Sequence, residues 1–116
     1  MELSETNLPA EVQGLELELI DSKNDSISIK EDNNIELIVK ALSSQTRRKI
    51  LHQIQEDGDG MDVSNIASNL GMTEANISAQ IKKLEEAGLI CCDYCSGQHG
   101  VRKISKLKYN QLFIKF

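Results

Sequence analysis

The chain lacks tryptophan and has only two tyrosines and two phenylalanines among its 116 residues. A platform that stacks single-stranded nucleic acid uses several aromatic rings, so this composition argues against one. No stretch approaches the roughly 20 apolar residues that a membrane-spanning helix needs. The first residues, MELSETNLPAE, are acidic and lack the basic segment and apolar block of a secretory signal. We therefore expect a cytoplasmic protein without a membrane segment.

Residue groups that are typical of catalysis are also missing. The sequence has no phosphate-binding glycine loop and no paired nucleophile and base, and His52 and His99 have no evident catalytic partner. Asp57, Asp59 and Asp62 are spaced like the start of a calcium loop, but the twelfth position carries serine instead of the required carboxylate. The sequence predicts neither an enzyme nor a calcium-binding protein.

Charge is distributed unevenly along the chain. The whole chain carries −5 at pH 7, and residues 1–36 hold 10 of its 18 acidic and 2 of its 13 basic side chains. Residues 37–116 hold the other 8 acidic and 11 basic side chains, which gives this part a net charge of +3. Because binding to phosphates depends on the local potential, the overall acidity does not exclude a nucleic-acid partner.

Residues 13–30 show the alternation that is typical of β-strands. Leu17 and Leu19 alternate with glutamates, and Ile27 and Ile29 alternate with serines. The DSKND sequence between them is typical of a turn. The pattern favours a β-hairpin, with a single amphipathic helix as the alternative. A hairpin alone is only marginally stable, so it must pack on the rest of the chain or on a second subunit.

Two helices are expected after the hairpin. Asp32 and Asn33 are good caps for the first helix, and Ser43 or Ser44 starts the second. The apolar positions of these helices are Ile35, Leu37, Ile38, Ala41 and Leu42 in the first, and Ile50, Leu51 and Ile54 in the second. The glycine-rich sequence EDGDGMD ends the second helix.

Residues 62–90, DVSNIASNLGMTEANISAQIKKLEEAGLI, predict two short helices joined by a tight turn. Gly71 suits the end of the first helix, where a positive φ is needed, and Gly88 suits the end of the second. Thr73 supplies a capping oxygen and Glu74 a favourable first-turn charge. The predicted buried positions are Val63, Ile66, Ala67 and Leu70, followed by Ile77, Ile81, Leu84 and Ala87.

The second of these helices keeps small, polar and basic side chains for its outward face. They are Ala75, Asn76, Ser78, Ala79, Gln80, Lys82 and Lys83. A DNA major groove requires such a surface, because amides contact base edges, small residues permit close approach and lysines contact phosphates. This stretch is therefore interpreted as a helix-turn-helix.

The sequences LICCDYC and VRKISKL predict two strands around the loop SGQHG. Directly after a recognition helix, such a hairpin is a wing. Its Gln98, His99, Arg102 and Lys103 suit a phosphate backbone or the minor groove. The tail KYNQLFIKF predicts a third β-like segment, which pairs with the N-terminal hairpin or contributes to a dimer interface.

The three cysteines, Cys91, Cys92 and Cys95, are expected to be reduced thiols in a cytosolic protein. Cys92, Cys95 and His99 are candidate ligands for zinc or another thiophilic metal. Strand geometry instead places Cys91 and Cys95 on one face and Cys92 on the other, so a metal site needs a bulge or a strand end between them. The alternative is that they are structural thiols.

Three segments resemble the ArsR-type winged helix-turn-helix transcription regulators: ALSSQTRRKIL at 41–51, the helix-turn-helix with its LEEAGL exit, and SGQHGVRKISKL. The resemblance covers about residues 35–108. It implies a homodimer that reads a near-palindromic operator with half-sites about one helical turn apart. Metal-sensing members often carry thiols in the first helix of the motif, whereas residues 63–70 contain none.

The resemblance also implies which residues contact DNA. Lys82 and Lys83 would lie near the edge of the major groove, and His99 and Arg102 would reach the backbone or the minor groove. The residues implied to face the major groove are Thr73, Glu74, Asn76, Ser78, Ala79 and Gln80. For the cluster Arg47, Arg48 and Lys49, two interpretations stay open: a solvated helix end, or an anchor for a DNA phosphate.

These observations predict an α+β, mainly helical fold: a winged helix-turn-helix with an N-terminal β-hairpin arm. The expected segments are an acidic arm at 1–34, the DNA-binding domain at 35–108 and a C-terminal β-like segment at 109–116. We expect a sequence-specific DNA-binding regulator that represses transcription as a homodimer on double-stranded DNA, without a cofactor. The alternatives are a winged-helix module that binds another protein, or a metal or redox sensor that uses the wing cysteines.

Overall fold

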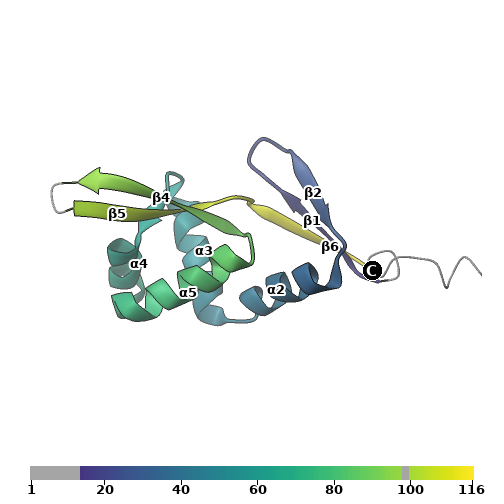
Figure 1. The fold of residues 1–116 in the computed structure, drawn as a ribbon, viewed down its shortest axis with the longest axis horizontal. Coiled ribbons are helices and arrows are strands. Elements are labelled where there is room, and N and C mark those ends of the chain that lie inside the picture. Colours follow the sequence, from purple (N-terminus) through teal and green to yellow (C-terminus); the bar gives the residue numbers. More distant parts are fainter. Residues whose placement is uncertain (1–13, 98–99) are drawn as a thin grey trace, which may run out of the picture. The chain divides into compact units, whose positions relative to one another are not determined.

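The computed structural model describes residues 14–97 and 100–116. Its chain divides into two compact units, one ending at Leu37 and completed by Tyr109–Phe116, the other spanning Ile38–Lys108. The described residues form four helices and two antiparallel three-stranded sheets, which confirms the predicted α+β class (Figure 1). Within these residues, no helix combines the length and the apolar character that crossing a membrane requires.

The first unit contains a sheet with the strand order β2-β1-β6, built from β1 (Glu16–Ile20), β2 (Ser26–Ile29) and β6 (Gln111–Lys115). The predicted N-terminal hairpin is confirmed, and the C-terminal segment pairs with its first strand. Leu17 lies opposite Ile29 on one side and Ile114 on the other. Leu17 and Leu19 are buried on the same face, as their spacing predicted.

The turn between β1 and β2 is stabilised by its own side chains. The Asp21 carboxylate accepts hydrogen bonds from the backbone nitrogens of Lys23, at 2.8 Å, and Asp25, at 3.0 Å. Asn24 adopts a positive φ of 69°, a conformation that asparagine tolerates better than most residues. The turn chemistry of DSKND therefore fixes the hairpin locally.

Two helices follow, α2 (Asp32–Leu42) and α3 (Gln45–Asp57). The expected caps of α2 were wrong, because Asp32 and Asn33 lie inside its first turn. The carbonyl of Glu31 already accepts the first helical hydrogen bond, from Ile35, at 3.0 Å. Of the two predicted starts of α3, Ser43 and Ser44, the second is the cap, since its side chain accepts a hydrogen bond from the Arg47 backbone nitrogen.

The second unit surrounds its core with three helices and a sheet of strand order β3-β5-β4. Its further elements are β3 (Met61–Asp62), α4 (Val63–Leu70), α5 (Glu74–Glu86), β4 (Ile90–Gly97) and β5 (Gly100–Leu107). The helices α3, α4 and α5 lie along one side of the β4–β5 hairpin (Figure 1). The fully buried side chains of this core include Ile50, Ile66, Ile77, Ile81, Leu84 and Ile90.

Glycines close both helices of the α4–turn–α5 motif. Gly71 has φ 67°, and the following Met72 nitrogen donates to the Ala67 carbonyl at 3.0 Å. Gly88 has φ 78°, and the next nitrogen, of Leu89, donates to Leu84 at 3.1 Å. Both ends are Schellman motifs, in which glycine avoids the cost of a left-handed backbone. The predicted helix ends are confirmed.

The short strand β3 had no signal in the sequence, because two residues form it through pairing with β5 alone. Gly60, just before it, approaches β5 closely: a Cβ added there would lie 2.8 Å from Ile104 Cγ2 and 2.9 Å from the Ser105 carbonyl oxygen. Its φ of 102° also disfavours other residues. A glycine that appeared to be a simple helix breaker therefore seats β3 against the wing.

Candidate nucleic-acid interface

Helix α5 presents a face of small, polar and basic side chains to solvent. Thr73 caps the helix by accepting a hydrogen bond from the Asn76 backbone nitrogen at 3.1 Å. Ile77, Ile81 and Leu84 are fully buried on the opposite face. The exposed predicted residues are Thr73, Glu74, Asn76, Ser78, Ala79, Lys82 and Lys83, and Gln80 is half-buried beside them. The structure therefore leaves seven of the eight predicted residues exposed and the eighth, Gln80, partly accessible.

The carboxamides on this face are hydrogen-bonded to one another and to α3. Arg47 Nη1 donates to Gln80 Oε1 at 2.7 Å, and Gln80 Nε2 donates to Asn76 Oδ1 at 3.1 Å. Asn76 Nδ2 lies 3.8 Å from the sulfur of Met72. These contacts hold the two amides in one row along the exposed helix.

The predicted basic cluster of α3 is tied to the end of α2. Arg47 donates from Nε to the Ala41 carbonyl at 2.8 Å and from Nη2 to the Lys40 carbonyl at 3.0 Å. Arg48 donates from Nη1 to the Leu42 carbonyl at 2.7 Å. These arginines satisfy carbonyls that a helix C-terminus leaves without intrahelical donors. Neither interpretation from the sequence, a solvated end or a phosphate anchor, included this role.

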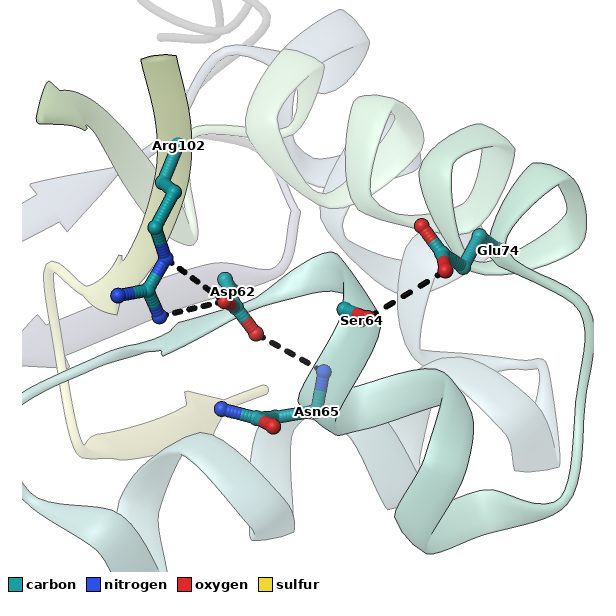
Figure 2. A network of polar contacts seen from close by, with 5 residues as sticks. All are labelled: Asp62, Ser64, Asn65, Glu74 and Arg102. Atoms are coloured by element: carbon teal, nitrogen blue, oxygen red, sulfur yellow. Dashed lines mark hydrogen bonds and ion pairs between the residues drawn. The ribbon is translucent and has the colours of Figure 1, made fainter. Parts of the chain in front are cut away.

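One carboxylate joins the wing to the start of α4. Asp62 caps α4 by accepting the Asn65 backbone hydrogen bond at 2.8 Å, and its other oxygen accepts from Arg102 Nε at 3.0 Å (Figure 2). Partial burial opposes ionisation of Asp62, but the hydrogen bonds from Asn65 and Arg102 and the charge of Arg102 outweigh it and lower the carboxyl pKa below 3.8. The predicted wing residue Arg102 is thus oriented by Asp62 while its side chain stays 54% exposed.

A second polar contact connects α4 with the start of α5. Ser64 Oγ donates to a carboxylate oxygen of Glu74 at 3.3 Å (Figure 2). Sequence reasoning missed the roles of Asp62 and Ser64. An aspartate directly before a helix is a recognisable capping signal, but its pairing with a residue 40 positions away has no local signal.

The other basic side chains of the wing also have acidic neighbours. Lys103 Nζ lies 3.7 Å from Glu85 Oε1, which links β5 to α5. Lys106 Nζ lies 2.8 Å from Asp93 Oδ2 on the neighbouring strand, and this contact raises the lysine pKa. The predicted contacts of Gln98 and His99 fall outside the described residues.

The cysteines lie on one unbroken strand. β4 pairs with β5 in a constant register from Ile90 to Gly97, so Cys92 lies on the face opposite Cys91 and Cys95. The bulge that a joint site of Cys92 and Cys95 needs does not occur between them. The Cys92 sulfur lies 3.6 Å from Ser105 Oγ, and burial raises the pKa of this thiol. Among residues 14–97 and 100–116, no three histidine, cysteine or acidic side chains are grouped so that they could hold a metal ion.

Residues 44–91, which span α3, the α4–turn–α5 motif and the start of β4, match the model of the bacterial regulatory protein, arsR family. The chain carries an ArsR-type helix-turn-helix. This ArsR-type segment and the β4–β5 hairpin that follows it form the predicted winged helix-turn-helix. The winged helix-turn-helix is a DNA-binding element of transcription regulators. The predicted family resemblance is confirmed.

Several solved structures share the fold of this chain. An ArsR family transcriptional regulator is 24% identical, with a TM-score of 0.55 over 67% of this chain and 74% of the other. The homodimeric winged helix-turn-helix DNA-binding domain of a possible ArsR-family regulator from Mycobacterium bovis is 22% identical, with a TM-score of 0.56 over 70% and 75%. The AntR antimony-specific transcriptional repressor is 20% identical, with a TM-score of 0.54 over 92% and 78%. A search of curated protein sequences gave no match.

Proposed function

We propose that this protein is a sequence-specific transcriptional repressor of the cytoplasm that binds a near-palindromic DNA operator as a homodimer. The observation that carries the proposal is the exposed face of α5, which presents amides, small residues and two lysines. The opposite face of this helix is buried in the core. A major groove takes a helix with such a surface. Residues 35–108 form the DNA-binding domain in this proposal.

Each part of the surface has a distinct task in the proposed complex. Asn76 and Gln80 read base edges, and Ala79 and Ser78 allow the helix to approach the bases closely. The phosphate contacts come from exposed or half-exposed basic side chains, namely Lys82, Lys83, Arg48, Arg102 and Lys103. Arg102 is directed by Asp62, so its contact with the backbone costs less side-chain entropy than a free arginine would lose.

The homodimer is supported by two observations. The M. bovis domain with the same fold is homodimeric. In this chain, β6 leaves large apolar side chains exposed, with Phe113 at 51% and Ile114 at 50%. These two side chains point to opposite faces of β6, and a second subunit could bury either of them. A two-fold dimer would present two α5 helices to half-sites one helical turn apart.

Gel shifts with fragments of the source genome test the proposal, at low and at physiological salt. We expect retardation of a few fragments at both salt concentrations and of most fragments at low salt only, because phosphate contacts weaken as salt rises. The retarded complex should contain two copies of the 12.9 kDa chain. Failure to retard any duplex at low salt would exclude the DNA-binding role.

A further inference from the structure

Arg47 starts a directed chain of hydrogen bonds that ends on the exposed face of α5. The chain runs from Arg47 Nη1 to Gln80 Oε1, at 2.7 Å, and from Gln80 Nε2 to Asn76 Oδ1, at 3.1 Å. The Asn76 amide nitrogen is left beside the Met72 sulfur at 3.8 Å, which is a weak acceptor. The oxygens of both carboxamides therefore accept hydrogen bonds from other side chains of the protein.

The chemistry of arginine makes this direction obligatory. A guanidinium has donors and no acceptor, so Arg47 can meet the oxygen of Gln80 but would repel its amide nitrogen. Because the Gln80 oxygen accepts from Arg47, the Gln80 amide nitrogen faces Asn76. Asn76 must then accept this hydrogen bond with its oxygen. Reversing either amide would set donor against donor or acceptor against acceptor.

Arg47 is itself immobilised, because the carbonyls of Ala41 and Lys40 accept from its Nε and Nη2. All three of its nitrogens thus have a protein acceptor, and the side chain is half-buried. An arginine with this set of partners is poorly placed to turn toward a phosphate. Arg47 can therefore affect a bound ligand by orienting Gln80.

We propose that Arg47 is a positioning residue that sets the polarity of the reading amides, so that Asn76 and Gln80 offer hydrogen-bond donors to DNA and select guanine. Guanine presents two acceptors, N7 and O6, in the major groove, whereas thymine presents one acceptor, adenine one acceptor and one donor, and cytosine one donor. The inference rests on the proposed function, because it assumes that α5 enters the major groove. It adds the kind of base that the helix reads and the residue that determines it.

Selection from a randomised duplex pool, followed by affinity measurements on the selected site, tests this polarity. For the unchanged protein we expect guanine at one position of each half-site, with discrimination of about tenfold or more over cytosine. In Gln80→Glu, the new carboxylate still accepts from Arg47 but donates nothing to Asn76. The Asn76 amide then turns its nitrogen inward and its oxygen outward, so the guanine preference should fall about tenfold and adenine or cytosine should gain.

Arg47→Gln and Arg48→Gln form a matched pair. Both remove a guanidinium that holds the end of α2, but Arg48 donates to the Leu42 carbonyl and not to Gln80. Arg47→Gln should lose base discrimination while its affinity for unrelated duplexes stays within about threefold. Arg48→Gln loses a proposed phosphate contact, so it should bind every duplex more weakly by the same factor and keep the discrimination. Circular dichroism checks that each variant is folded, and Gln80→Glu supplies the test if Arg47→Gln is not.

The outcomes separate this inference from the function on which it rests. Unchanged guanine selection by folded Gln80→Glu, or selection of cytosine by the unchanged protein, would overturn the polarity while leaving DNA binding intact. Absence of binding to every duplex at low salt would instead remove the proposed function. Loss of preference in folded Arg47→Gln together with retention in Arg48→Gln would support the role of Arg47.

Discussion

Asp62 performs two tasks with one side chain, since it caps α4 and orients the wing through Arg102. Asparagine would keep the cap but not the charge, so Asp62→Asn should reduce the free energy of unfolding at pH 7 by at most about 1 kcal/mol, as Arg102 is largely exposed. Asp62→Ala should cost about 1 kcal/mol more because it also removes the cap. Urea unfolding of the three proteins measures both differences.

The effect of Asp62→Asn should depend on pH. The folded-state pKa of Asp62 is lowered from 3.8, so its contribution is present above about pH 4 and is lost as the pH falls through the lowered pKa. The stability difference between the unchanged protein and Asp62→Asn should therefore shrink between pH 7 and about pH 2.5. An equal difference at both pH values would show that the charge of Asp62 contributes nothing.

Single residues were predictable from the sequence where the interaction is local. Thr73, Gly71 and Gly88 act within one helix turn of their own positions, and each was placed correctly. The contacts of Arg102 with Asp62 and of Arg47 with Gln80 join residues 40 and 33 positions apart. Such pairs depend on how elements pack, which residue type and spacing do not encode.

Strand β4 places its three thiols on two faces that differ in their exposure to solvent. Cys91 and Cys95 are exposed, whereas Cys92 is half-buried and its thiol pKa is raised by burial. Because the thiolate is the reactive form, Cys92 should react with iodoacetamide at least about tenfold more slowly than the other two at pH 7.5. Mass spectrometry of the native protein over time follows each cysteine separately.

A control with urea-unfolded protein should remove the difference in thiol reactivity. Equal alkylation rates for the three cysteines in the native protein would contradict the placement of Cys92 against Ser105. The result also bears on the sensor alternative, because a sensing thiol must be accessible.

Elements with strong periodicity were predictable, and those formed by pairing were not. The alternation in β1 and β2 and the apolar stripes of α4 and α5 gave correct types, since one buried face imposes a period on the sequence. β3 is two residues long and exists only because β5 lies beside it. β4 also extends to Gly97, further than its apolar residues indicated, because β5 supplies a partner at every position.

In the chain taken as a whole, the acidic and basic side chains are unevenly distributed along the sequence. Residues 1–36 carry most of the acidic side chains, and the rest of the chain is net positive. The winged fold and the resemblance of the helix-turn-helix to the arsR family followed from three sequence segments taken together.

In the proposed function the exposed face of α5 binds DNA, and Ala79 lies exposed on that face. Ala79→Glu adds a carboxylate there, while Ser22→Glu adds the same charge in the exposed turn between β1 and β2. Equilibrium binding of both variants to a fragment that the unchanged protein retards is the most direct measurement. We expect Ala79→Glu to lose at least about 100-fold in affinity through like-charge repulsion, and Ser22→Glu to stay within about threefold. Full affinity in folded Ala79→Glu would show that this face of α5 does not bind DNA.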